Sequence, residues 1–464
     1  QYILQILPNN FKSQILKMLL NNFPKLDYNI HELEKKRGER MNYQKQEIKP
    51  GITLHQIYTE NYKTNLNAIF LATPLKKENV TLDALLTAVL RRGTKNIPSQ
   101  DLISQKLEML YGASFDCGVE KTGDNHIMKF YLETLSEEFL PSSENILKEA
   151  MDILTDIIFN PLIEVNKFKP EYVEGEKKNL KQIIEAKIDN KARYAYDRCI
   201  EEMFKDKPYG LYKYGYIEDL EKITPEELYN YYKTLIDNCK IDIFYSGTID
   251  KEKVKQTIEQ NENIKKLNAR KPEYIVNNET TEQIEIREPN IINESMQVTQ
   301  GKLVMGLNIN ETAEDSRFIS AVYNAILGGG ANSKLFQNVR EKASLAYTTG
   351  SNYNRTKNCI FIRAGIEIQN YQKALCTIKQ QLEDMKNGNF TDKDIKDSKE
   401  LIIASIEGIS EEQDTEITYY YGQELANRFV DLKEYMDKIK AVTKDQIVKL
   451  AQNININTIY FLKD

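Results

Sequence analysis

The order of predicted elements in this 464-residue chain occurs twice, and this duplication is the feature that most limits the fold. A shift of about 232 positions aligns Asp83 with Asp315 and Phe115 with Tyr347. In both parts a strand precedes a helix, a glycine-containing turn, a second helix, a small-residue turn and a hairpin. Repetition on this scale predicts two similarly folded α+β domains.

The first copy shows the periodicities of such a domain. Alternating residues at 53–58 and an apolar run at 68–72 predict two strands. Apolar residues at spacings of three and four predict a helix over 82–90, and Ser99 can cap a second helix over 100–110. Further predicted elements are a hairpin turn at 122–125, its second strand at 126–133, long helices at 143–159 and 171–204, and a strand at 241–246.

We expect four segments along the chain. Met41 follows a charged run and is expected to be the natural start, which makes residues 1–40 an N-terminal extension of uncertain origin. The alternative is a native arm built on a short amphipathic helix at 15–20. The remaining segments are an N-terminal domain at 41–267, a polar linker at 268–283 and a C-terminal domain at 284–464.

The composition is that of an ordinary soluble chain, with 41% apolar and 28% charged residues. A net charge of -6 gives no indication of a nucleic-acid partner. No apolar run approaches the length of a membrane span, and no secretory signal is recognised. Five cysteines are scattered without a C-x-x-C motif, which predicts reduced thiols in a cytoplasmic protein.

Residues 328–347 form the most informative stretch, G-G-G-A-N-S-K-L-F-Q-N-V-R-E-K-A-S-L-A-Y. The glycines suit a tight loop, and Ser333 can cap the helix that follows. Residues 345–349 read as a strand. Arg340 therefore lies near the end of a helix and Tyr347 in the next strand, where both side chains could enter one cleft.

Arg340 and Tyr347 offer a specific chemistry. A guanidinium presents a planar fork of donors to a carbonyl or carboxylate, and a phenol can donate to a developing oxyanion. However, an Arg on an amphipathic helix is usually solvated and a Tyr in a strand is usually core. Spacing alone therefore favours a structural interpretation of both residues.

The run at 333–347 resembles the C-terminal-half signature of the pitrilysin/insulinase family of metallopeptidases, which includes mitochondrial processing peptidase. The resemblance covers nearly everything after Met41. It implies an α+β clam-shell of two tandem homologous α/β-sandwich halves joined by a polar linker. It also implies that Arg340 and Tyr347, the candidate catalytic residues, assist a zinc site from across a cavity.

Catalytic members of that family carry H-x-x-E-H on the first helix of the N-terminal half, just before Gly-Thr. Two His at i and i+4 bind zinc, and the Glu between them is the general base. Counting back from Gly93-Thr94, the same positions here are Ala84-Leu85-Leu86-Thr87-Ala88. An alanine methyl group cannot bind a metal, and a threonine hydroxyl cannot act as a base near neutral pH.

The family also uses a Glu from a later long helix as the third ligand, which corresponds to the region 176–185. Gln182 or Ile183 is the expected position, and neither is a good zinc ligand. Glu185 is nearby but could not hold the metal alone. His31, His55 and His126, the only histidines in the chain, lie in three different elements and are expected to be structural. We therefore predict no metal ligand and no cofactor in this chain.

The runs at 90–94, 107–113 and 193–199 resemble the bacterial YmfF-type subgroup of the family, whose members lack the zinc motif. By resemblance, such chains pair with a zinc-bearing H-x-x-E-H relative in a heterodimer. The chain is then an accessory subunit of a metalloendopeptidase, with zinc in the partner and a peptide as substrate. No nucleic-acid or membrane partner is expected.

Two other functions remain open. The chain could be a non-enzymatic scaffold or peptide-binding homologue, in which Arg340 and Tyr347 are structural. It could also be a self-sufficient hydrolase, but no serine, cysteine or carboxylate pair has a convincing partner in the sequence. The adjacent gene and the metal content of the purified chain would separate these functions.

Overall fold

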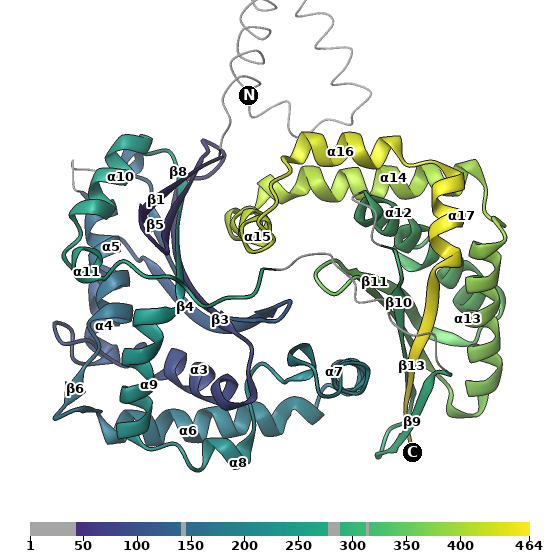
Figure 1. Cartoon of the computed structure of the whole chain (residues 1–464), viewed down its shortest axis with the longest axis horizontal. Helices are drawn as coiled ribbons and strands as arrows, with labels where there is room; N and C mark the ends of the chain where they lie inside the picture. Colours follow the sequence, from purple (N-terminus) through teal and green to yellow (C-terminus); the bar gives the residue numbers. More distant parts are fainter. Residues whose placement is uncertain (1–42, 141–144, 277–287, 312–314) are drawn as a thin grey trace, which may run out of the picture.

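The computed structural model describes residues 43–140, 145–276, 288–311 and 315–464 as two halves that face each other (Figure 1). The predicted helix at 15–20, His31, the predicted start at Met41 and the second part of the predicted linker lie outside these residues. Within the described ranges, no helix combines the length and apolarity needed to cross a membrane.

A six-stranded sheet forms the N-terminal half. Its order is β1 (Tyr43–Lys49), β2 (Ile52–Tyr58), β8 (Lys240–Gly247), β3 (Thr64–Pro74), β5 (Asn125–Leu135) and β4 (Ser114–Thr122). Only the β2–β8 pair is parallel. The outer helices are α3 (Lys77–Leu90), α4 (Gln100–Met109), α5 (Ile146–Phe159), α6 (Pro170–Glu185), α8 (Ile217–Leu220), α9 (Pro225–Asn238), α10 (Lys251–Gln260) and α11 (Glu262–Lys266).

Strand β3 is apolar along most of its length because both faces of the sheet are covered. Ile69 and Leu71 belong to the core under the outer helices. Ala68 and Phe70 point the other way and belong to a separate inner core. A strand buried on both faces reads as a continuous apolar run, which is the pattern seen in the sequence.

A five-stranded sheet forms the C-terminal half. Its order is β11 (Ala346–Asn354), β12 (Cys359–Ile366), β10 (Gly301–Ile309), β13 (Ile454–Lys463) and β9 (Asn290–Ser295). Its helices are α12 (Ser316–Gly328), α13 (Tyr371–Lys386), α14 (Asp392–Glu407), α16 (Leu432–Ala441) and α17 (Lys444–Gln452), with a π-helical segment η4 (Phe336–Lys342) before β11. The predicted α+β fold with two similar halves is confirmed.

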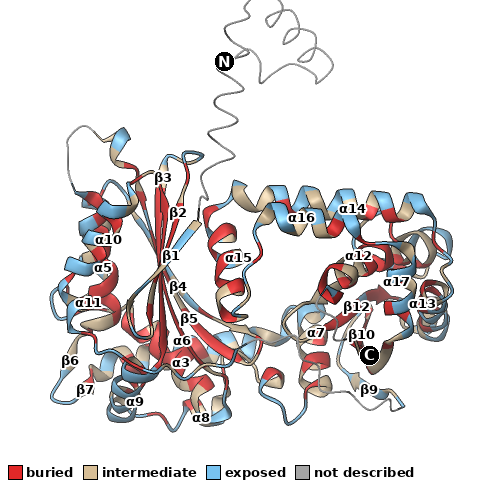
Figure 2. Cartoon of the chain, turned by 45° about the horizontal axis from the view of Figure 1, so that its top comes forward, coloured by how far each residue is buried: buried red, intermediate tan, exposed pale blue. Residues whose placement is uncertain are grey.

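The halves exchange one helix each. Helix α7 (Lys191–Met203) belongs to the N-terminal half, but its Ala195 and Cys199 pack on the C-terminal sheet against Phe361 and Tyr460. In return, α15 (Gln413–Leu425) covers the inner face of the N-terminal sheet. Figure 2 shows the buried side of α15 turned toward that sheet. Each half thus completes the core of the other.

This exchange corrects the predicted long helix at 171–204. Helix α6 ends at Glu185, a short 3-10 turn (Ala186–Ile188) follows, and α7 begins at Lys191. The Asn190 side chain accepts the backbone N–H of Arg193 and so starts a new helix. The break lets α7 leave its own half and reach the other sheet. The other elements predicted in the first copy are confirmed in type, with ends that differ by up to five residues. Residues 143 and 144 of the predicted helix at 143–159 lie outside the described residues.

Polar contacts strengthen the joint between the halves. The Gln413 amide donates to the carbonyl oxygens of Thr64 (3.2 Å) and Ser246 (3.0 Å). At the other side, Lys357 in the β11–β12 turn lies 2.9 Å from both oxygens of Asp124 in the β4–β5 turn. The two hairpin tips therefore meet across the joint.

Helix α15 also carries a titratable group into this interface. Glu416 is 4% exposed, and burial raises the pKa of its carboxyl from 4.5 to about 7. The folded protein therefore holds this proton at a pH where the unfolded chain has released it. Stability should fall as pH rises from about 4.5 to about 7 and lose no more from this group above that range.

Replacing Glu416 with Gln should remove this loss. We expect Glu416→Gln to be more stable than the parent by about 1–3 kcal/mol at pH 8 and nearly equal to it at pH 4. Urea unfolding at pH 4, 6 and 8 measures the difference. A difference that does not change with pH would contradict the prediction.

Candidate functional site

In the first helix of the N-terminal half, α3, the segment where the resemblance expects a zinc motif is buried and mainly apolar. Ala84 is 5% and Thr87 is 3% exposed on α3. The Thr87 hydroxyl donates back to the Asp83 carbonyl oxygen at 2.8 Å. The Cys117 thiol of β4 lies 3.7 Å from the Thr87 carbonyl oxygen. Methyl groups, a hydroxyl and a thiol thus fill this position.

The region expected to supply a third ligand is also committed elsewhere. Glu176 of α6 is buried, and its Oε1 lies 2.7 Å from Nε of Arg92, two residues after α3. The Arg92 guanidinium also donates to Gln100. Gln182 and Ile183 are exposed. The residues present therefore do not fit a zinc ion. Across the described residues, no group of three or more His, Cys, Asp and Glu side chains is placed to hold a metal.

The two described histidines are buried and hydrogen-bonded. His55 lies between the Tyr43 hydroxyl (2.8 Å) and the Asp242 carboxylate (2.9 Å). His126 lies between Asp83 Oδ2 (2.9 Å) and the Lys213 carbonyl oxygen (2.9 Å). Each ring nitrogen thus has a polar neighbour inside the protein, which agrees with the predicted structural role.

Asp83 is a residue whose importance the sequence did not reveal. It is fully buried on α3 and accepts hydrogen bonds from His126 of β5 and, at 2.5 Å, from Tyr231 of α9. One carboxylate thus ties a helix to the sheet and to a second helix. The available signal was an acidic residue among the apolar positions of the predicted helix at 82–90.

Arg340 and Tyr347 lie in one helix–turn–strand unit of the C-terminal half, as predicted. Arg340 is in the π-helical segment η4, and such segments are rare and frequent at functional sites. Ser344 takes a positive φ of 53° at the turn, and the Leu345 N–H donates to the Val339 carbonyl oxygen at 3.0 Å. The chain then enters β11, where Tyr347 is the second residue.

Both side chains are exposed. Tyr347 is 60% exposed, and its hydroxyl donates to Glu367 Oε1 at 3.2 Å. The Arg340 guanidinium lies over the Phe336 ring, 4.5 Å from the centroid, and its Nε is 3.7 Å from Glu341. In the described part of the chain, no hydrogen bond joins Arg340 to Tyr347. Both belong to the η4–turn–β11 unit, and each side chain has a local partner.

Strands β4 and β11 hold the outermost positions at one end of their sheets. Each has one edge with no neighbouring strand among the described residues. A free edge presents unpaired N–H and C=O groups that can receive an extended peptide. Tyr347 lies on the free-edge strand of one half, and β4 packs beside α3 in the other.

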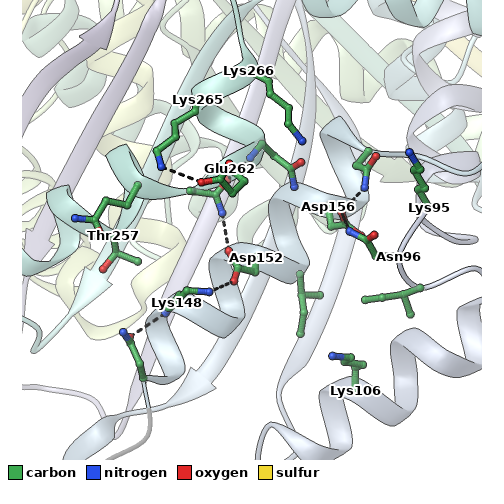
Figure 3. Close-up of a pocket in the computed structure, with 17 residues that line it drawn as sticks. Lys95, Asn96, Lys106, Lys148, Asp152, Asp156, Thr257, Glu262, Lys265 and Lys266 are labelled. Atoms are coloured by element: carbon green, nitrogen blue, oxygen red, sulfur yellow. Dashed lines mark hydrogen bonds and ion pairs between the residues drawn. The ribbon is translucent and has the colours of Figure 1, made fainter.

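A cavity of about 750 Å³ lies elsewhere, among the outer elements of the N-terminal half (Figure 3). Its three carboxylates are engaged. Asp152 contacts Lys148 and Asn261, Asp156 contacts Thr94, Asn96 and Asn160, and Glu262 contacts Lys265. Neither Arg340 nor Tyr347 lines this cavity, so it is separate from the candidate site.

Comparisons with known proteins match both halves. A family model described as "Insulinase (Peptidase family M16)" matches residues 84–214, and one described as "Peptidase M16 inactive domain" matches residues 222–402. The "Probable inactive metalloprotease YmfF" of Bacillus subtilis is 35% identical over 442 residues, which cover 94% of this chain and 98% of that protein.

Solved structures agree with the fold. A conserved protein from Enterococcus faecalis superposes with a TM-score of 0.83 at 27% identity, covering 91% of this chain and 98% of that one. The structure titled as a peptidase M16 inactive domain from Pseudomonas fluorescens gives a TM-score of 0.73 at 17% identity, with the same coverage. The second likeness concerns the fold alone.

Proposed function

Because this chain belongs to the insulinase family of peptidases, M16, as a member with an inactive metal site, we propose that it is the zinc-less subunit of a heterodimeric metallopeptidase. One contrast carries the proposal. The two zinc-ligand positions on α3 hold Ala84 and Ala88 and the general-base position holds Thr87. In contrast, Arg340 and Tyr347 are exposed, and Tyr347 lies on a free-edge strand. A chain with only the second half of the site needs a partner for the first.

In this proposal the zinc, the attacking water and the general base all come from an H-x-x-E-H partner. The peptide lies as an added strand against a free sheet edge, which gives affinity through its backbone. The Tyr347 phenol exchanges its bond with Glu367 for the substrate carbonyl oxygen, where charge develops. Arg340 holds the peptide or orients Tyr347.

The proposed setting is the cytoplasm. All five cysteines are free thiols, and three of them are fully buried in the cores. Thiols of this kind are typical of a reducing compartment, which agrees with the sequence-based prediction.

Reconstitution tests the proposal. The purified chain and an H-x-x-E-H relative from the same organism are assayed for peptide cleavage, separately and mixed, with metal analysis of each sample. We expect a stable complex that contains zinc and cleaves peptides, and no cleavage by this chain alone. Stoichiometric zinc and cleavage in the isolated chain would overturn the proposal.

The same experiment separates the scaffold alternative. A scaffold would form a complex whose activity survives the double substitution Arg340→Ala and Tyr347→Phe. A chain that associates only with itself, with no affinity for the zinc-bearing relative, would also favour that alternative.

A further inference from the structure

Three residues of adjacent strands form one row on the inner face of the N-terminal sheet. Phe70 of β3 is directly opposite Lys129 of β5. Lys129 is in turn directly opposite Gly118 of β4. Because β4 is an outermost strand, a peptide strand that pairs with its free edge would place one of its residues next in this row.

Lys129 is a cation without a committed partner. Its side chain is half-buried, and burial lowers its pKa. Its ammonium lies 5.6 Å from the centroid of the Phe70 ring. The charged groups that face it are Glu120, Lys213 and Asp414. Of these, Glu120 is already paired with Lys213 at 3.1 Å. Among the described residues, no carboxylate forms an ion pair with Lys129.

Gly118 leaves the path from Lys129 to the sheet edge open. It is exposed, and a methyl group added to it would meet no atom within 4 Å. Neighbouring strands are about 4.8 Å apart, so a strand added to β4 would lie about 10 Å from β5. A lysine and an acidic side chain can meet over that distance when the residue between them has no side chain.

We propose that Lys129 recognises a carboxylate of the bound peptide across the gap left by Gly118. The inference rests on the proposed peptide-binding function and adds a substrate class to it, namely peptides with an acidic residue opposite Gly118. The neighbouring row ends in the exposed Asp116, directly opposite Tyr131. The peptide residue two positions away should therefore be neutral or basic, because like charges opposite each other are destabilising.

A binding experiment with three labelled peptides tests this inference. The peptides share one extended sequence and carry Glu, Gln or Lys at a single position, which is moved along the sequence in successive sets. Fluorescence anisotropy measures their dissociation constants for the full chain. At one position we expect Glu to bind about tenfold tighter than Gln, with Lys weaker still.

Two substitutions locate the effect. Lys129→Met keeps the length of the side chain and removes its charge, so the preference for Glu should disappear while the Gln peptide binds as before. Gly118→Val fills the gap with a side chain and keeps the backbone N–H and C=O groups of β4. It should also abolish the preference. The control Lys379→Met makes the same charge change on the exposed surface of α13 and should keep it.

The outcomes separate the inference from the function beneath it. Peptides that bind without any preference for Glu, or with a preference that survives Lys129→Met, would overturn the role of Lys129 and leave the peptide-binding function standing. If no peptide binds the chain, the proposed peptide-binding function fails and the inference fails with it.

Discussion

Replacing Tyr347 with Phe is expected to lower the turnover number of the reconstituted peptidase about 100-fold. Loss of one oxyanion donor costs about this factor in acyl-transfer enzymes, because the donor acts where charge develops in the transition state. The KM should change little, since the phenol contributes mainly after the carbonyl is attacked. Steady-state kinetics of the complex, at equal zinc content, measure both quantities.

Tyr353→Phe is the matched control for this substitution. Tyr353 lies on the same strand, β11, and its hydroxyl donates to Asn358 at 3.2 Å. Its removal should leave turnover within about twofold of the parent. If Tyr347→Phe is as active as the control, Tyr347 has no part in the chemistry and the scaffold function gains support.

Replacing Asp83 with Ala is expected to destabilise the protein by about 3–5 kcal/mol, the range for removal of one partner from a buried charged network. The substitution leaves the His126 ring and the Tyr231 hydroxyl without their acceptor inside the core. The Tyr231 hydroxyl and the Nδ1 atom of His126 would then lose their acceptor, and α3 would lose its polar contact with the sheet. Urea unfolding followed by circular dichroism measures the loss.

Asp315, which the sequence shift of about 232 positions pairs with Asp83, supplies the control. In the structure Asp315 is the N-cap residue before α12, is half exposed and contacts Lys438 at 3.1 Å. A solvent-exposed pair of this kind contributes about 0–1 kcal/mol, so Asp315→Ala should cost little. Equal losses of unfolding free energy for the two substitutions would contradict the prediction that burial makes the Asp83 contacts the more stabilising ones.

Much of the fold could be predicted because its signals are local. The helix over 82–90, the Ser99 cap and the hairpin at 122–125 each follow from spacing or from a single residue type, and the structure confirms them. The exchange of α7 and α15 could not be predicted in this way. It depends on which sheet each apolar face meets, and amphipathicity does not encode that choice.

The candidate site also combines features that the sequence shows locally with features that depend on the folded structure. The missing metal ligands at Ala84 and Ala88 are visible in the residues themselves, and the family membership predicted from the run at 333–347 is confirmed. The roles of Arg340 and Tyr347 stay a prediction. Lys129 drew no attention in the sequence, because its position depends on the register of three strands that are distant in the chain.

The helix exchange limits how this protein can be divided. A fragment ending in the predicted linker at 268–283 would keep α7 but lack α15, so the inner cluster around Phe70 and Phe244 would be open to water. The complementary fragment would expose the surface of Phe361 and Tyr460 that α7 normally covers. We expect each fragment to aggregate when expressed alone. Co-expression should recover soluble material, because α7 of one fragment and α15 of the other can then cover both exposed core surfaces.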